Sequence, residues 1–220
     1  MFSQRAIATV LGFGMVAGGI ACRTAAPDAR PAIVQPGAPG EPSEVISAAA
    51  AVDLSRVQHT PADVRFMQGM IGHHAQALEM VALLPSRTAS DDMKKLALRI
   101  EASQADEIKM MQEWLTSRGQ PLPDAHAHHA RGAVLMPGML TAEEMATLTA
   151  AKGSAFDRLF LEFMIKHHEG ALVMVKELFS TPGAGQESDI FAFASDVDAD
   201  QRMEIDRMSA MLASPKELAR

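Results

Sequence analysis

The sequence predicts an all-α protein: a four-helix bundle made of two duplicated helical hairpins. Between residues 60 and 213, apolar side chains recur at spacings of three and four, the period of amphipathic helices. No stretch alternates apolar and polar residues long enough to indicate a sheet. The second half of this region also repeats the first. Two hairpins with matching apolar faces are expected to pack together, because each has a face to bury.

The first hairpin is expected over residues 60–118. Thr60, followed by a proline and then an acid at the third helical position, is a typical helix start. Pro85 is expected to end this helix, and Ser90 with two following aspartates begins the next. Gly119 is expected to end the second helix.

The second hairpin is expected over residues 141–213, after a histidine-containing loop at 119–140. Thr141 with a glutamate three residues later forms a capping-box pattern for a short helix. A long helix should then run to about Phe179, and the last helix over about residues 188–212.

The internal repeat preserves more than an apolar period. Phe66–Val81 aligns with Phe160–Val175 at an offset of 94, with nine of sixteen positions identical, and the following helices align at an offset of 97. Polar residues at stripe positions would point into the bundle, where an unpaired imidazole or carboxylate is costly, so each needs a partner. A His–Glu hydrogen bond is one solution and a metal ion is the other. The preserved pairs are His73/His167, His74/His168, Gln104/Gln201, Glu107/Glu204, Met70/Met164 and Met111/Met208.

These residue types predict a site for a soft or borderline metal. Helical spacing places each of Met70 and Met164 beside a pair of histidines. Imidazole with thioether suits Cu(I) and, by extension, Ag(I), whereas imidazole with carboxylate suits Cu(II) or Zn(II). We therefore expect a copper ion, with Cu(I) favoured and silver or zinc as alternatives. The candidate metal ligands are His73, His74, His167, His168, Met70, Met164, Met111, Met208, Glu107 and Glu204.

Each of these residues also has a structural interpretation. A methionine at helical spacing is usually core filler, and one histidine of each pair can serve only to orient the other. Glu107 and Glu204 are as readily structural partners as ligands. The loop histidines His126, His128 and His129 are either an accessory metal-gathering site or, as we favour, part of a solvated spacer.

Composition and missing motifs exclude several classes of protein. With 20 Lys+Arg against 27 Asp+Glu, the net charge of −7 argues against nucleic-acid binding. A single cysteine excludes a disulfide framework and a Cys-rich zinc or iron–sulfur site. HExxH, Glu-x-x-His, GxSxG and P-loop patterns are all absent. We therefore expect no enzymatic activity.

The N-terminal segment reads as an export signal. Residues 1–21 combine an early arginine, an apolar run and small residues, as in a secretory signal peptide. Cys22 then stands where bacterial lipoproteins are lipidated, and residues 22–57 form a Pro/Ala/Gly-rich tether without helical period. The sequence thus predicts a periplasmic lipoprotein of the bacterial cell envelope that contacts the membrane only through its lipid anchor.

The two motifs Met70-Ile71-Gly72-His73-His74 and Met164-Ile165-Lys166-His167-His168, each paired with a Gln-x-x-Glu-Ile helix, resemble the domain of unknown function 305 family. The resemblance covers about residues 58–213, within an expected domain at 58–214. It implies a ferritin-like helical fold, and some family members bind copper and silver through Met and His. Val173 replaces Glu79 in the second copy, and Met211 replaces Trp114, so the half-sites need not be equivalent.

We expect this protein to buffer, deliver or confer resistance to copper in the envelope. Two alternatives remain open at this point. One is a non-catalytic envelope interaction module whose His–Glu pairs are structural, and the other is a metal-dependent redox enzyme. Metal ions are the expected partners, and the sequence leaves a homo-oligomer open.

Overall fold

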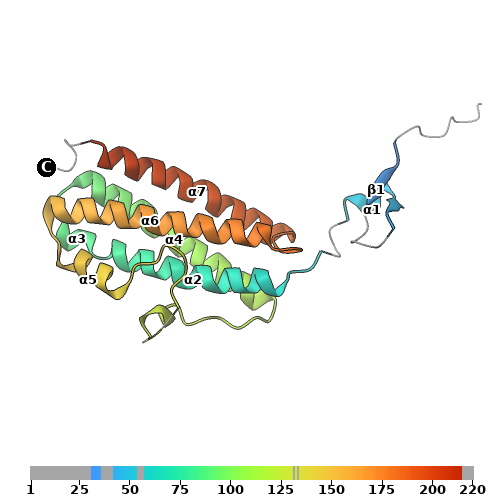
Figure 1. Cartoon of the computed structure of the whole chain (residues 1–220), viewed down its shortest axis with the longest axis horizontal. Helices are drawn as coiled ribbons and strands as arrows, with labels where there is room; N and C mark the ends of the chain where they lie inside the picture. Colours follow the sequence, from blue (N-terminus) through green and yellow to red (C-terminus); the bar gives the residue numbers. More distant parts are fainter. Residues whose placement is uncertain (1–30, 36–41, 54–56, 131, 133, 215–220) are drawn as a thin grey trace, which may run out of the picture. The chain divides into compact units, whose positions relative to one another are not determined.

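The computed structural model of this 220-residue chain describes residues 31–35, 42–53, 57–130, 132 and 134–214 (Figure 1). It divides into two compact units, one up to Asp53 and the other from Leu54 onward. The expected signal peptide at 1–21 and the expected lipidation site Cys22 lie outside the described residues. No helix in the described ranges is both long enough and apolar enough to cross a membrane.

The first unit contains short regular elements that differ from the expected spacer. Strands β1 (Ile33–Gln35) and β2 (Glu44–Ile46) pair antiparallel, with Ile33 opposite Ile46, and the one-turn helix α1 follows at Ala48–Ala51. The β-branched residues of these strands favour extended backbone. The proline-rich composition that predicted a tether concealed this local preference.

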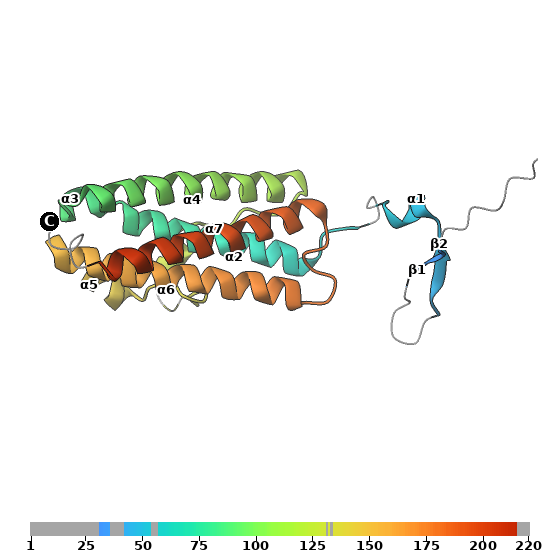
Figure 2. The same cartoon turned by 90° about the horizontal axis from the view of Figure 1, so that it is seen from above.

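The second unit confirms the all-α fold. Helices α2 and α4 form one antiparallel hairpin, α6 and α7 form the other, and α2 packs against α6 (Figures 1 and 2). The long helices are α2 (Pro61–Val81), α4 (Asp91–Ser117), α6 (Gly153–Ser180) and α7 (Ser188–Leu212); the short ones are α3 (Leu84–Arg87), the 3₁₀ turn η1 (Ala127–His129) and α5 (Ala142–Ala150).

Most helix starts form as the sequence predicts, but Pro85 does not end the first helix. Helix α2 already ends at Val81, and Pro85 lies in the first turn of α3, where a proline is tolerated. Thr60 and Asp63 make a reciprocal capping box at the start of α2, with the Thr60 N–H donating to the Asp63 carboxylate at 2.6 Å. Ser90 caps α4. Helix α6 is different, because it begins at Gly153 with a φ of +59° and no side-chain cap.

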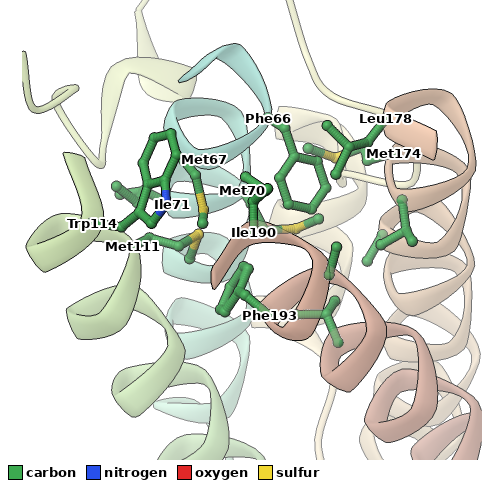
Figure 3. Packing of buried hydrophobic residues seen from close by; sticks show 14 of the residues in the cluster. Phe66, Met67, Met70, Ile71, Met111, Trp114, Met174, Leu178, Ile190 and Phe193 are labelled. Carbon is green, nitrogen blue, oxygen red and sulfur yellow. The ribbon is translucent and has the colours of Figure 1, made fainter. Parts of the chain in front are cut away.

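The bundle core forms two apolar clusters related by the repeat. The first joins the N-terminal half of α2 to the C-terminal half of α6, and includes Phe66, Met70 and Met174 (Figure 3). The second joins the opposite halves, and includes Met80, Phe160 and Met164. Because Phe66 matches Phe160 in the repeat, the clusters are counterparts at the two ends of the bundle. The paired histidines of α2 and α6 lie in sequence between the residues that each helix gives to these two clusters.

The segment between α4 and α5 is a long crossover, which connects the two hairpins and returns along the bundle (Figure 1). Gln68 donates to the Pro121 carbonyl at 2.8 Å, and Gln76 exchanges two hydrogen bonds with the Leu140 backbone. The crossover also lies directly on α6, where a Cβ atom on Gly170 would lie 2.0 Å from the Pro137 carbonyl oxygen. Only glycine permits this approach.

We predict that Gly170→Ala destabilises the protein by about 1–3 kcal/mol, because the new methyl group must push the crossover away from α6. This loss should exceed the gain of about 1 kcal/mol that alanine normally brings to a helix interior. Gly72→Ala in α2 is the matched control, since its Cβ would meet only the Ala125 carbonyl oxygen at 3.8 Å. Urea unfolding of the two variants measures the difference, and equal stabilities would contradict this packing.

Candidate metal centre

Four histidines form a buried histidine layer at the middle of the bundle. His73 and His74 come from α2, His167 and His168 from α6, and each is at most 1% exposed. Because α2 and α6 run antiparallel, equivalent positions of the repeat meet where the helices cross. The rings of His73 and His167 face each other there, with centroids 3.8 Å apart and planes 39° from parallel.

The second histidine of each pair contacts a carboxylate from its own hairpin. His74 Nε2 lies 2.5 Å from Glu107 Oε2 on α4, and His168 Nε2 lies 2.6 Å from Glu204 Oε2 on α7. Both glutamates are largely buried, so each His–Glu pair satisfies two polar groups that would be costly to bury alone. The hydrogen-bonded pair, one of the two solutions left open by the sequence, is therefore present in both hairpins.

The inward-facing pair has no carboxylate partner among the described residues. His73 Nε2 lies 3.0 Å from the Pro137 carbonyl oxygen, so the crossover covers this ring. Within the described part of the chain, both ring nitrogens of His167 and Nδ1 of each of the other three histidines are buried without a hydrogen-bond partner. The side-chain oxygens of Gln104 and Gln201, also buried, are likewise without one among those residues. Buried polar atoms are normally paired, so this concentration marks a place where a ligand would supply what the fold does not.

Burial also keeps the two inward-facing rings neutral. Desolvation, helped by the neighbouring His74, lowers the pKa of His73 from 6.5 to about 3, although its contact with Pro137 raises it somewhat. Desolvation and the facing His73 ring lower the pKa of His167 well below its usual value, although a contact with the His73 backbone acts in the opposite direction. A neutral imidazole retains a nitrogen lone pair, which is the form that binds metals.

The four candidate methionines are fully buried in the apolar clusters. Met70 and Met111 belong to the first cluster, in which Met111 lies near Trp114 and Met70 near Ile190 (Figure 3). Met164 and Met208 belong to the second. Met70 and Met164 each precede the inward-facing histidine by three residues, which is less than one helical turn. All four methionines pack in the apolar core, and that they ligate a metal remains a prediction.

An acidic groove of about 410 Å³ lies between α4 and α7. Asp106, Asp196 and Asp200 line it together with Glu107, which is also the partner of His74. Partial burial, together with the charges of Glu107 and Glu204, raises the pKa of Asp200. The groove therefore joins negative charge at the surface to the edge of the histidine layer, an arrangement that attracts cations.

A second histidine cluster lies on the crossover, where the sequence favoured a solvated spacer. The structure fits that interpretation only in part: the side chains of His126 and His129 are more than half exposed, but all three histidines contact Glu79 of α2 and the His128 side chain is only 6% exposed. Sequence reasoning could not place a loop against a helix 47 residues away. The available signal was Glu79 itself, a charged residue that the second repeat replaces with Val173.

Residues 63–212 match the family described as "Domain of unknown function (DUF305)". The chain belongs to this family. A DUF305 fragment from Deinococcus radiodurans is similar, with 34% identity, a TM-score of 0.59, and coverage of 70% of this chain and 97% of that one. A DUF305 protein from Streptomyces coelicolor, described as secreted, has 31% identity and a TM-score of 0.58, covering 69% and 91%.

The structural relatives of this DUF305 chain also include CopM. Its Cu(I)-bound form has 27% identity and a TM-score of 0.53, covering 67% of this chain and 93% of CopM. CopM structures with Cu(II) and with silver are similar as well. Among curated proteins no sequence matches this chain significantly.

We predict that the stability of the metal-free protein falls as the pH is lowered from 7 to 5.5. The unfolded chain takes up protons on His73 and His167 near pH 6.5, whereas folded His73 does so only near pH 3 and folded His167 well below 6.5. The unfolded state therefore binds more protons in this interval, and each ring should cost about 1 kcal/mol across it. Urea unfolding at several pH values tests this, with His73→Leu/His167→Leu as the comparison. An unchanged slope in that variant would contradict the assignment.

Proposed function

We propose that this protein binds copper ions outside the cytoplasm, with Cu(I) held at the buried histidine layer, and serves in copper buffering, resistance or delivery. One observation carries the proposal. The facing rings of His73 and His167 are neutral, buried, and retain ring nitrogens without partners in the described residues. Such donors fit a soft monovalent ion better than they fit a solvated hard cation.

The surrounding residues suit this chemistry in different ways. Met70 and Met164 would add thioether sulfur from the adjacent turn, a donor that favours Cu(I) and Ag(I) over calcium or magnesium. Glu107 and Glu204 hold the rings of His74 and His168 by short hydrogen bonds, and their negative charge would offset that of a buried cation. In this scheme the inner histidines bind, and the outer histidines and glutamates position them.

The relatives of the chain support the same ion class. CopM, similar over most of its length, is known in forms with Cu(I), Cu(II) and silver. The acidic groove beside Glu107 would draw a cation toward the layer from the α4–α7 side. The description of the Streptomyces coelicolor relative as secreted fits the signal peptide predicted at residues 1–21.

We predict that the mature protein retains Cu(I) in native mass spectrometry under reducing conditions, and that His73→Ala/His167→Ala weakens this binding at least about tenfold, since it removes two ligands. His59→Ala is the matched control, because His59 packs on Trp114 and takes no part in the buried layer. Ag(I) should follow the same order of affinities.

The same titration, together with an assay of oxygen and peroxide turnover, separates the alternative functions. If the double variant binds as much Cu(I) as the control, the His–Glu pairs are structural and an interaction module is the better interpretation. If the copper-loaded protein turns over oxygen or peroxide, and the double variant does not, the redox-enzyme alternative is correct. Binding without turnover supports buffering or delivery.

The lipid anchor is tested separately. Cys22→Ser should release the protein from the membrane fraction into the soluble fraction, because the substitution removes the thiol that would be lipidated. Fractionation of cells that produce the full-length chain measures this, with the wild-type protein as reference. Unchanged partitioning of the variant would contradict the anchor while leaving the copper proposal intact.

A further inference from the structure

The geometry points to a second metal site on the crossover, in which Glu79, His126, His128 and His129 bind a borderline divalent cation, Cu(II) or Zn(II). This site is separate from the buried histidine layer, and its chemistry differs because it offers imidazole and carboxylate without a methionine among the four groups. It does not depend on the function proposed above.

The four side chains already converge. His126 Nδ1 and His129 Nε2 each lie 2.9 Å from Glu79 Oε1, and His128 Nε2 lies 3.4 Å from Glu79 Oε2. One donor atom from each residue falls within 4.8 Å of all the others. Around a tetrahedral ion with bonds of about 2.0–2.1 Å, ligand atoms stand about 3.3 Å apart. Small side-chain rotations would therefore bring these atoms to coordinating positions.

Hydrogen bonding alone accounts poorly for this arrangement. Two imidazoles contact the same carboxylate oxygen, and a third approaches the same group, although the side chains of His126 and His129 are 64% and 58% exposed to competing water. The His128 side chain is only 6% exposed, and its Nδ1 has no hydrogen-bond partner in the described ranges. Ordering three rings around one carboxylate costs side-chain entropy that exposed hydrogen bonds repay weakly.

The electrostatics suit a cation. Glu79 is the carboxylate that all three imidazoles contact through a ring nitrogen. Three imidazoles and one carboxylate form a ligand set typical of zinc and Cu(II), and lack the sulfur that favours Cu(I). The two sites would then differ in the oxidation state of the copper they prefer.

The position of the site gives it a structural consequence. The crossover is fastened to α2 at Pro121 by Gln68 and at Leu140 by Gln76, and its Pro137 carbonyl covers His73. The histidine cluster joins the intervening part of the crossover to Glu79 on the same helix. An ion at this place would therefore hold down the segment that covers the buried layer.

The experiment is a calorimetric titration of the whole mature protein with Zn(II) and, separately, Cu(II), with electron paramagnetic resonance of the Cu(II) form. Glu79→Gln should weaken binding at least about tenfold, and His126→Ala/His129→Ala should abolish it and the Cu(II) nitrogen couplings. Glu177→Gln, at an exposed glutamate of α6, is the matched control and should bind as the wild type does. Circular dichroism should show that all variants remain folded, as expected for changes at a half-exposed surface.

The loop variants and the variant of the buried layer test the two sites separately. Loss of Zn(II) or Cu(II) binding in the loop variants, with Cu(I) binding retained, supports the second site. The His73→Ala/His167→Ala variant should show the reverse pattern, with its Zn(II) binding intact. If the loop variants bind Zn(II) and Cu(II) as tightly as the control, the second site is overturned, whatever the buried layer does.

Discussion

The contact between His73 and His167 at the crossing of α2 and α6 organises the centre of the bundle. Two imidazoles are placed where an ordinary bundle would have apolar side chains, and burial holds them neutral. The fold tolerates this because the neighbouring histidines are paired with carboxylates and because an apolar cluster closes each end of the bundle. The cost of the unpaired nitrogens remains, and a bound ion would remove it.

The repeat explains why the layer is nearly symmetric. Each hairpin contributes one inward histidine, one histidine held by a glutamate, and one buried glutamine, and the antiparallel crossing of α2 and α6 brings the two sets together. The crossover breaks this symmetry, because it caps His73 through Pro137 and leaves the nitrogens of His167 without such a contact. The two half-sites are therefore alike in residues and unlike in environment.

The four long helices of the bundle could be predicted from the sequence. Caps such as Thr60 and Ser90 define helix starts by local hydrogen bonds, and the apolar period defines the buried faces. The repeat placed the histidines inside. What the sequence could not settle is which histidine of each pair faces the partner hairpin, because adjacent residues lie about 100° apart and the rotation of each helix depends on tertiary packing.

The second histidine cluster, on the crossover, could not be predicted from the sequence for a different reason. A loop follows no periodicity, so nothing local indicates that His126 and His129 lie against Glu79. The close approach of the crossover to Gly170, which depends on a missing side chain, was equally invisible. Both features arise from long-range packing, and both lie on the segment that covers the centre.

The most direct measurement is anomalous diffraction from crystals of the protein grown with Cu(I) under reducing conditions. We expect a copper peak inside the bundle, within coordinating distance of the imidazole nitrogens of His73 and His167. Crystals in which those two rings keep their metal-free positions, and in which copper occupies only surface residues, would contradict it.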